Sequence, residues 1–176
     1  MIIENPADIS KYVSPLNILI ATSGGFDPLH IGHVRSIIEA RSVSSQKLLL
    51  YDPLFKYFRK ENLRLVVIVN GTNFLLQKKG YEFMPLKERM EIIDNLKEVD
   101  FVTTWDQIGK DTTVIEALKL FRPMFFIKGG DRVPGTVAEE STLQSWGGKV
   151  IYGVGGNNKI QSSSSLVDKS GIRLTV

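Results

Sequence analysis

The chain has 176 residues, of which 43% are hydrophobic and 23% charged, so it is long and apolar enough for one folded domain with a substantial core. A formal charge of +3 without a basic stripe does not predict a nucleic-acid partner, and it fits a site for small anionic substrates. The absence of Cys excludes disulfides, and no membrane span or secretion signal is recognisable, so we expect no membrane partner and a cytoplasmic location.

The first strong signal follows a lead-in of residues 1–15. A β-branched apolar run begins at Ile18 and ends in the pair Gly24 and Gly25, and helical periodicity begins after His33. This order predicts a strand, a tight loop and a helix whose N-terminus faces the loop. Because such a terminus presents unpaired N–H groups and partial positive charge, the loop is a candidate phosphate site.

The only two histidines of the chain, His30 and His33, occur where this helix begins. Their spacing of three residues places both rings on one helical face, from which each can donate a hydrogen bond to the same polyphosphate. Gly32 between them, like Gly24 and Gly25, leaves room for a ligand to approach the backbone. In the alternative interpretation, one histidine caps the helix and the other packs against the core.

The residues around the histidines resemble the signature of the nucleotidyltransferase superfamily, which includes cytidylyltransferases, adenylyltransferases and class I aminoacyl-tRNA synthetases. They read Gly25-Phe26-Asp27-Pro28-Leu29-His30-Ile31-Gly32-His33. The resemblance implies that both histidines stabilise the α- and β-phosphates of a nucleoside triphosphate as pyrophosphate departs. Phe26 and the neighbouring glycines are then nucleotide-binding candidates. Asp27 either orients a histidine or metal, or is a turn residue before Pro28.

Residues 42–46 are polar and predict a break after the first helix. The next stretch, residues 47–62, is rich in leucine and aromatic side chains and looks like an insertion. We expect an amphipathic helix or hairpin there, broken near Pro53. It either packs on the domain or forms a homo-oligomer contact, and the sequence favours neither.

Residues 64–70 form a nearly continuous apolar run, as expected for a strand that is covered on both faces. A loop is expected after it, and it carries Lys78 and Lys79 beyond the end of the strand, where open α/β sheets bind ligands. A pair of lysines is usually a solvated surface. In the resembling sugar-phosphate nucleotidyltransferases, however, a Lys before a Gly contacts the phosphates, and Lys79 matches that position.

A helix with Pro85 in its first turn follows, over residues 84–96. Arg89 within it matches an arginine that binds substrate phosphate in the resembling enzymes. The competing interpretation is an ordinary salt bridge on the exposed face of the helix.

The third strand begins at residues 99–102, a helix covers residues 112–121, and the fourth strand covers residues 124–127. The tetrapeptide Lys128-Gly129-Gly130-Asp131 ends that strand. Two glycines permit close approach of a ligand, and a carboxylate accepts bonds from sugar hydroxyls, although such a sequence is more often a turn. It resembles the heptose-phosphate adenylyltransferases in particular, which makes all four residues nucleotide-binding candidates.

A helix over residues 136–146 and a fifth strand over residues 149–153 precede a serine run. The run matches the Ser/Thr triplet of the family, which helps to bind nucleotide phosphates, and we align it with Ser162, Ser163 and Ser164. Serine hydroxyls at a helix N-terminus can also simply cap it. Some relatives carry an Arg just before the triplet; here Lys159 is a candidate substitute.

Five strands alternating with helices predict a single domain over residues 1–176, with a Rossmann-like, doubly wound parallel sheet and helices on both faces. The site is expected where the first and fourth strands diverge. The resemblance spans residues 17–168 and implies transfer of a nucleoside monophosphate, from ATP by preference, to a phosphorylated sugar. Mg²⁺ is expected to be shared between phosphate oxygens, with no metal held by the protein alone. The alternatives are a CTP-dependent polyol-phosphate cytidylyltransferase and a non-catalytic nucleotide-binding protein.

Overall fold

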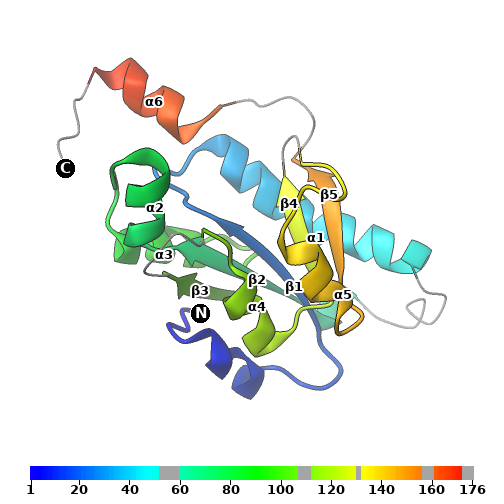
Figure 1. Cartoon of the computed structure of the whole chain (residues 1–176). Coiled ribbons are helices and arrows are strands. Elements are labelled where there is room, and N and C mark those ends of the chain that lie inside the picture. The colour runs from blue at the N-terminus through cyan, green and yellow to red at the C-terminus, as the bar shows by residue number, and fades with distance from the viewer. Residues whose placement is uncertain (52–59, 107–111, 130–131, 156–160, 172–176) are drawn as a thin grey trace.

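The computed structural model describes residues 1–51, 60–106, 112–129, 132–155 and 161–171, without the side chains of residues 43–51 and 60. Five parallel strands form one sheet in the order β3-β2-β1-β4-β5 (Figure 1). Their bounds are β1 Ile18–Gly24, β2 Leu63–Asn70, β3 Phe101–Trp105, β4 Phe125–Gly129 and β5 Lys149–Val154. The order reverses at β1, which pairs with both β2 and β4, and this confirms the predicted doubly wound parallel sheet.

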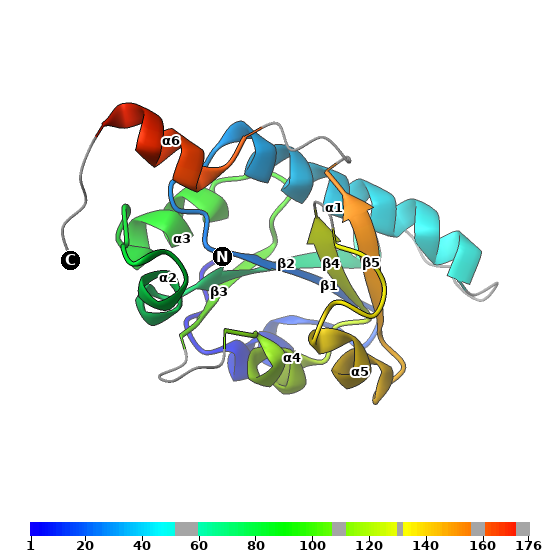
Figure 2. The same ribbon diagram turned by 45° about the horizontal axis from the view of Figure 1, so that its top comes forward.

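Helices cover both faces of the sheet (Figure 2). On one face, α1 (Ile31–Tyr51) and α3 (Leu86–Asp94) pack through residues such as Ile37 and Ile93. On the other, the 3-10 helix η1 (Pro6–Tyr12), α4 (Ile115–Phe121) and α5 (Glu139–Gln144) pack through Ile9, Leu118 and Leu143. The remaining helices are η3 (Lys60–Asn62), α2 (Thr72–Lys79) and α6 (Ser163–Ser170). The carboxyl ends of the strands are therefore left as the edge at which a ligand can enter.

The predicted break at residues 42–46 is wrong, because α1 continues without interruption to Tyr51. Serine is only weakly unfavourable in helices, and tertiary contacts fix α1 just before the expected break. Arg41 donates to the backbone oxygen of Leu63 at 3.2 Å and to the carboxylate of Asp100 at 2.5 Å. The first residues of the predicted insertion thus belong to α1, and Pro53 lies outside the described residues.

The loop expected after β2 is instead the helix α2. Its first residues are capped by Asp106, which follows β3 and accepts hydrogen bonds from the backbone N–H groups of Asn73 and Phe74, each at 3.2 Å. Asp106 fits tightly, since a Cβ added at Gly71 would lie 2.1 Å from its carboxyl carbon.

None of the helices among the described residues combines the length and the apolar composition that a membrane span requires.

Candidate active site

The loop after β1 folds back over the end of its own strand. Phe26 has a left-handed backbone conformation, with φ of 52°, and its ring covers Gly24, where an added Cβ would come within 2.9 Å of it. A Cβ at Gly25 would lie 2.8 Å from the Leu75 side chain. The space beside each glycine is therefore filled by a protein side chain, whereas the sequence predicted room for a ligand, and both glycines still line the cleft.

The two histidines form a stacked pair at the start of α1. Their ring centroids are 3.7 Å apart and the ring planes differ by 18°. The backbone N–H of Gly32 donates to Nδ1 of His30 at 3.1 Å. Because Nδ1 accepts this bond, the neutral His30 ring carries its proton on Nε2. His30 lies just before α1, where its bond from Gly32 caps the helix as in the alternative interpretation, and His33 lies in the first turn. Both residues line the same cleft.

His33 is held in its neutral form. Burial lowers its pKa to about 3, and the neighbouring charges of His30 and Lys79 contribute in the same direction. The ring of Phe26 packs edge-on against it at 5.1 Å, and Nδ1 of His33 is buried without a hydrogen-bond partner among the described residues. At neutral pH, His33 therefore acts as a polar hydrogen-bonding group and not as a cation.

This burial predicts a pH dependence of stability. An unfolded histidine titrates near 6.5, so below that pH the unfolded state binds a proton that folded His33 does not. Neutral His33 therefore costs no stability above about pH 6.5. As the pH falls from 6.5 towards 3, the free energy of unfolding decreases by up to about 1.4 kcal/mol per pH unit. Urea denaturation between pH 7 and pH 4.5 should show a weaker decline for His33→Asn than for wild type. Parallel curves would contradict the neutral assignment.

Lys79, at the end of α2, lies beside the histidines. Its Nζ atom donates to the backbone oxygen of Asp27 at 2.7 Å, and burial lowers its pKa. The carboxylate of Asp27 is fully buried and accepts from the backbone N–H groups of Phe83 and Met84, at 2.9 and 2.6 Å. These hydrogen bonds of Asp27 involve neither histidine, and they tie the β1 loop to the segment before α3.

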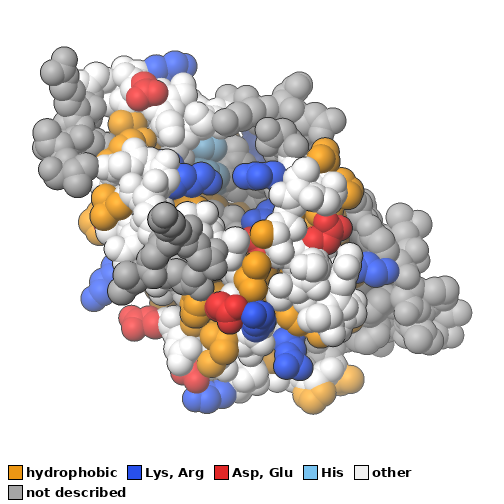
Figure 3. All heavy atoms as spheres, viewed as in Figure 1, with side chains coloured by type: hydrophobic (Ala, Val, Ile, Leu, Met, Phe, Trp, Pro, Cys, Tyr) orange, Lys and Arg blue, Asp and Glu red, His pale blue; other side chains and the backbone are white. Residues whose placement is uncertain are grey.

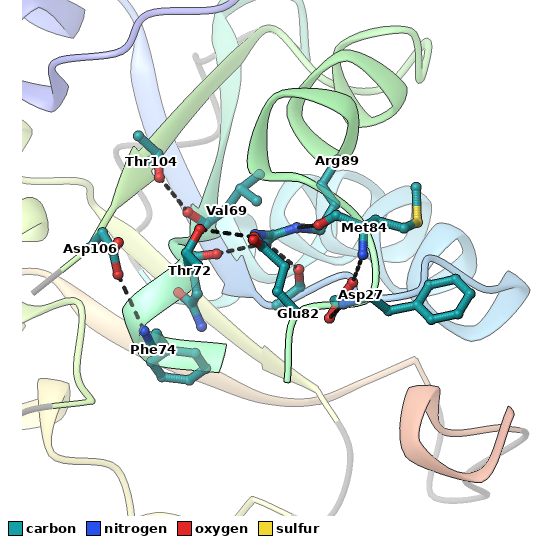
Figure 4. Close-up of polar contacts among 12 residues, drawn as sticks. Asp27, Val69, Thr72, Phe74, Glu82, Met84, Arg89, Thr104 and Asp106 are labelled. Atoms are coloured by element: carbon teal, nitrogen blue, oxygen red, sulfur yellow. Dashed lines mark hydrogen bonds and ion pairs between the residues drawn. The ribbon is translucent and has the colours of Figure 1, made fainter. Parts of the chain in front are cut away.

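Arg89, like Asp27, ties the β1 loop to neighbouring segments (Figure 4). Its side chain is buried, and the guanidinium donates to the backbone oxygens of Met84, Gly25 and Asn70 at 2.9, 2.8 and 2.7 Å. It also forms an ion pair with Glu82 at 2.5 Å. Arg89 is absent from the lining of the cleft. The structure therefore matches the salt-bridge interpretation, though in a buried position, and does not place Arg89 as a substrate-phosphate ligand.

Lys128 and Gly129 end β4 on the other side of β1. Lys128 forms an ion pair with Glu139 at 3.2 Å and lies 4.5 Å from the centre of the Phe126 ring. Its burial lowers its pKa, an effect that the charge of Glu139 opposes. Gly129 is required by packing, because a Cβ there would lie 2.9 Å from the backbone oxygen of Val154. Gly130 and Asp131 lie outside the described residues.

The serine run closes the cleft at the start of α6. Ser162 caps the helix by accepting from the backbone N–H of Ser165 at 3.2 Å, and Ser163 donates to the backbone oxygen of Pro28 at 3.0 Å. With Ser164, both line the cleft. The run therefore serves as the helix cap and also faces the histidine loop, while Lys159 lies outside the described residues.

One cleft of about 700 Å³ brings these groups together at the carboxyl ends of the strands. Four cationic side chains line it, namely Lys78, Lys79, Lys128 and Arg132, against a single described carboxylate, Glu139. Figure 3 shows Lys and Arg side chains gathered around a hollow in which histidine is visible. Sequence reasoning preferred Lys79 to Lys78 as the phosphate contact, and it missed Arg132 and Asn70. The cleft has the charge and the donors to hold a polyphosphate.

Comparison with known proteins agrees with this geometry. The family model described as cytidylyltransferase-like matches residues 21–167. The chain belongs to the cytidylyltransferase-like family. This confirms the resemblance drawn from the motif and the expectation of a nucleotidyltransferase.

The relatives include proteins named bifunctional protein HldE, of which two are described. The one from Geotalea uraniireducens is 31% identical over 135 residues, and the one from Koribacter versatilis is 28% identical over 134 residues; each alignment covers 75% of this chain. The chain spans only 23% of the length of either relative. A solved structure, the lipopolysaccharide core biosynthesis protein from Thermoplasma volcanium, shares the fold with a TM-score of 0.51 and 21% identity, covering 77% of this chain and 93% of its own.

Proposed function

We propose that this member of the cytidylyltransferase-like family transfers a nucleoside monophosphate from a nucleoside triphosphate, ATP by preference, to a phosphorylated sugar, with release of pyrophosphate. The observation that carries the proposal is the stacked pair of His30 and His33 in a cleft lined by four cationic side chains. The preference for ATP rests on Lys128-Gly129-Gly130-Asp131, which resembles the heptose-phosphate adenylyltransferases.

In this reaction an oxygen of the acceptor's phosphate attacks the α-phosphorus of the triphosphate. The bond between the α-phosphorus and the α,β-bridging oxygen breaks, and pyrophosphate leaves with the electron pair. The attacking phosphate monoester is already ionised at neutral pH, so the step needs no strong general base. Positioning and stabilisation of negative charge supply the acceleration.

Each group in the cleft has a proposed role in binding the phosphates. His30 offers its Nε2–H from the start of α1, and neutral His33 lies against it. Lys79 supplies a cation beside them, and Ser162, Ser163 and Ser164 line the cleft at the start of α6. A preorganised set of donors of this kind stabilises charge on the transferring and departing phosphates.

Magnesium enters the proposal with the substrate. Glu139 is the one described carboxylate in the cleft, and it is paired with Lys128. The described residues also contain no cluster of three His, Cys, Asp or Glu suited to a metal. This donor set fits an ion that is carried by the triphosphate oxygens and keeps several of its waters. The substrate is accordingly the magnesium complex of the triphosphate.

The direct test is pyrophosphate release from each of the four common nucleoside triphosphates, paired with a panel of sugar and polyol phosphates. We expect release that requires both substrates and is highest with ATP and a sugar phosphate. Highest release with CTP and a polyol phosphate would replace this assignment with a cytidylyltransferase. No release with any pair, together with measurable triphosphate binding, would support the non-catalytic alternative.

Lys79 and Lys78 provide a matched pair for the triphosphate site. Lys79→Ala should weaken binding of magnesium ATP by about tenfold or more, because it removes a partly buried cation beside the histidines. Lys78→Ala should weaken binding of magnesium ATP by less than about threefold, since the Lys78 side chain is more exposed than that of Lys79. Calorimetric titration of both variants checks this. Equal small effects would remove Lys79 from the phosphate site.

A further inference from the structure

We infer that Asp106 is a positioning residue for the proposed reaction, because it fixes α2 from outside the cleft so that Lys79 stays beside the two histidines. The inference rests on the proposed function, and it concerns how the site is held in place. Asp106 comes directly after β3, is exposed, and is absent from the lining of the cleft. Any effect of Asp106 on ligand binding must therefore pass through another residue.

The helix α2 depends on contacts from outside itself. It has eight residues, of which only Leu75 is buried, and an isolated helix of that length is not stable in water. Its cap residue, Gly71, makes no side-chain hydrogen bond to the first turn. The N–H groups at the start of a helix need partners, so α2 requires an acceptor from another part of the chain.

Asp106 supplies that acceptor with both oxygens of its carboxylate. Oδ2 accepts from the backbone N–H and from the side-chain amide of Asn73, at 3.2 and 3.1 Å, and Oδ1 accepts from the backbone N–H of Phe74 at 3.2 Å (Figure 4). The negative charge also lies at the positive end of the helix dipole. Because the two oxygens bind successive N–H groups, they fix the direction of the first turn as well as its place.

The sheet determines where Asp106 lies. Trp105, the last residue of β3, pairs with Asn70, the last residue of β2, and the backbone oxygen of Trp105 accepts from the N–H of Gly71 at 3.0 Å. Asp106 and Gly71 follow this pair, and they are so close that a side chain at Gly71 would overlap the carboxylate. The carboxylate therefore ties the start of α2 to the end of β3.

The other end of α2 reaches the cleft. Lys79, its last residue, donates from Nζ to the backbone oxygen of Asp27 at 2.7 Å, and its charge contributes, after burial and His30, to the low pKa of His33. Phe74 and Lys79 lie about 7.5 Å apart along the helix axis, so a tilt of the first turn also displaces Lys79. A displacement of about 1 Å is enough to weaken the action of a group that holds a ligand.

A cap that only stabilises the fold and a cap that positions Lys79 predict different results. Loss of the first lowers the melting temperature and leaves ligand affinity unchanged in the folded protein. Loss of the second also weakens binding of the triphosphate, and it does so only while Lys79 is present. The coupling between Asp106 and Lys79 therefore distinguishes the two roles.

A double-mutant cycle measures this coupling. The variants are Asp106→Ala, Asp106→Asn, Lys79→Ala and the double variant Asp106→Ala, Lys79→Ala, each titrated calorimetrically with magnesium α,β-methylene ATP and also melted. The matched control is Asn5→Ala, because Asn5 caps η1 by accepting from the backbone N–H of Ala7 at 3.1 Å and does not line the cleft. Titrations are made well below the melting temperature of every variant, so that the protein is folded.

We expect Asp106→Ala to weaken binding of the probe by about fivefold, the equivalent of losing one helix cap. In the Lys79→Ala background the same change should weaken it by less than about twofold. The melting temperature should fall by about 2 to 4 °C in both backgrounds. Asp106→Asn should bind within about twofold of wild type, because its carboxamide oxygen still accepts from the first turn. Asn5→Ala should lower the melting temperature similarly and leave the affinity unchanged.

Each of three results would overturn the inference. Asp106→Ala could lower the melting temperature without changing the affinity, which would make Asp106 a structural cap alone. It could weaken binding equally in both backgrounds, which would exclude action through Lys79. Finally, Asp106→Asn or Asn5→Ala could weaken binding as much as Asp106→Ala, which would indicate a general effect of charge or of stability.

Failure of the proposed function gives a different result. If the coupling is present but wild type releases no pyrophosphate with any pair of substrates, the reaction is contradicted while Asp106 still positions Lys79. If wild type binds no probe at all, both the proposed function and this inference are contradicted.

Discussion

His30→Ala and His33→Ala are each expected to lower kcat/KM for pyrophosphate release by about a hundredfold or more, the usual effect of removing a preorganised donor from a transition state. The melting temperature should stay within about 5 °C of wild type, because both rings lie at a helix terminus on the cleft wall and not in either core cluster. Arg35→Ala is the matched control, since Arg35 is exposed on the same helix and does not line the cleft.

Steady-state assays with the best triphosphate and acceptor give the first quantity, and thermal melts give the second. If both variants retain wild-type turnover and melt normally, the histidines have no catalytic role and the binding-protein alternative gains support. A loss of activity that follows a loss of folded protein would instead assign them a structural role.

Arg89→Met is expected to have the largest effect on stability, a loss of about 3 to 5 kcal/mol, as found when one partner of a buried ion pair is removed. Methionine fills similar space but donates no hydrogen bonds. The substitution leaves the Glu82 carboxylate without its cation and three backbone oxygens, of Met84, Gly25 and Asn70, without their donor. Urea denaturation measures the change in the free energy of unfolding.

Lys87→Met is the control for Arg89→Met, because Lys87 is exposed on the same helix and should change stability by less than about 0.5 kcal/mol. Adding Glu82→Gln should recover part of the loss, since it removes the uncompensated charge. An Arg89→Met protein as stable as wild type, but with weaker binding of sugar phosphates, would return Arg89 to the role of a substrate ligand.

Arg89 also shows where sequence reasoning reached its limit. The local pattern predicted the helix that carries it, but its partners come from the β1 loop, the end of β2 and the segment before α3. Burial of a guanidinium depends on that tertiary arrangement, and a single sequence does not report it. The same holds for α2, whose N-terminus is capped by Asp106 from beyond β3.

The elements of the fold that the sequence predicted correctly are those that depend on local signals. The apolar run, the glycine pair and the histidine spacing were sufficient to predict β1, the loop and the start of α1, and the alternation of strands and helices predicted the sheet. The serine run was expected to open a helix, with capping as one role for its hydroxyls, and Ser162 does cap α6. By contrast, Asn70 reads as one more residue at a strand end, and only its burial without a partner distinguishes it.

The network formed by Arg89, Glu82 and Asp27 supports the loop that carries the histidines. Arg89 donates to Gly25 and Asp27 accepts from Phe83 and Met84, so the loop is tied to α3 and to the residues before it on both sides of Phe26. We therefore expect activity to depend on this network through the position of the histidines, although none of Arg89, Glu82 and Asp27 lines the cleft.

The most direct test of the central claim follows two labels of ATP through one turnover with the best sugar phosphate. Attack at the α-phosphorus predicts that wild type moves the α-phosphate label into the sugar nucleotide and the γ-phosphate label into pyrophosphate. The double variant His30→Ala, His33→Ala should form neither labelled product in the same time. Transfer of the γ-label to the sugar phosphate, or release of that label as inorganic phosphate alone, would contradict nucleotidyl transfer at this site.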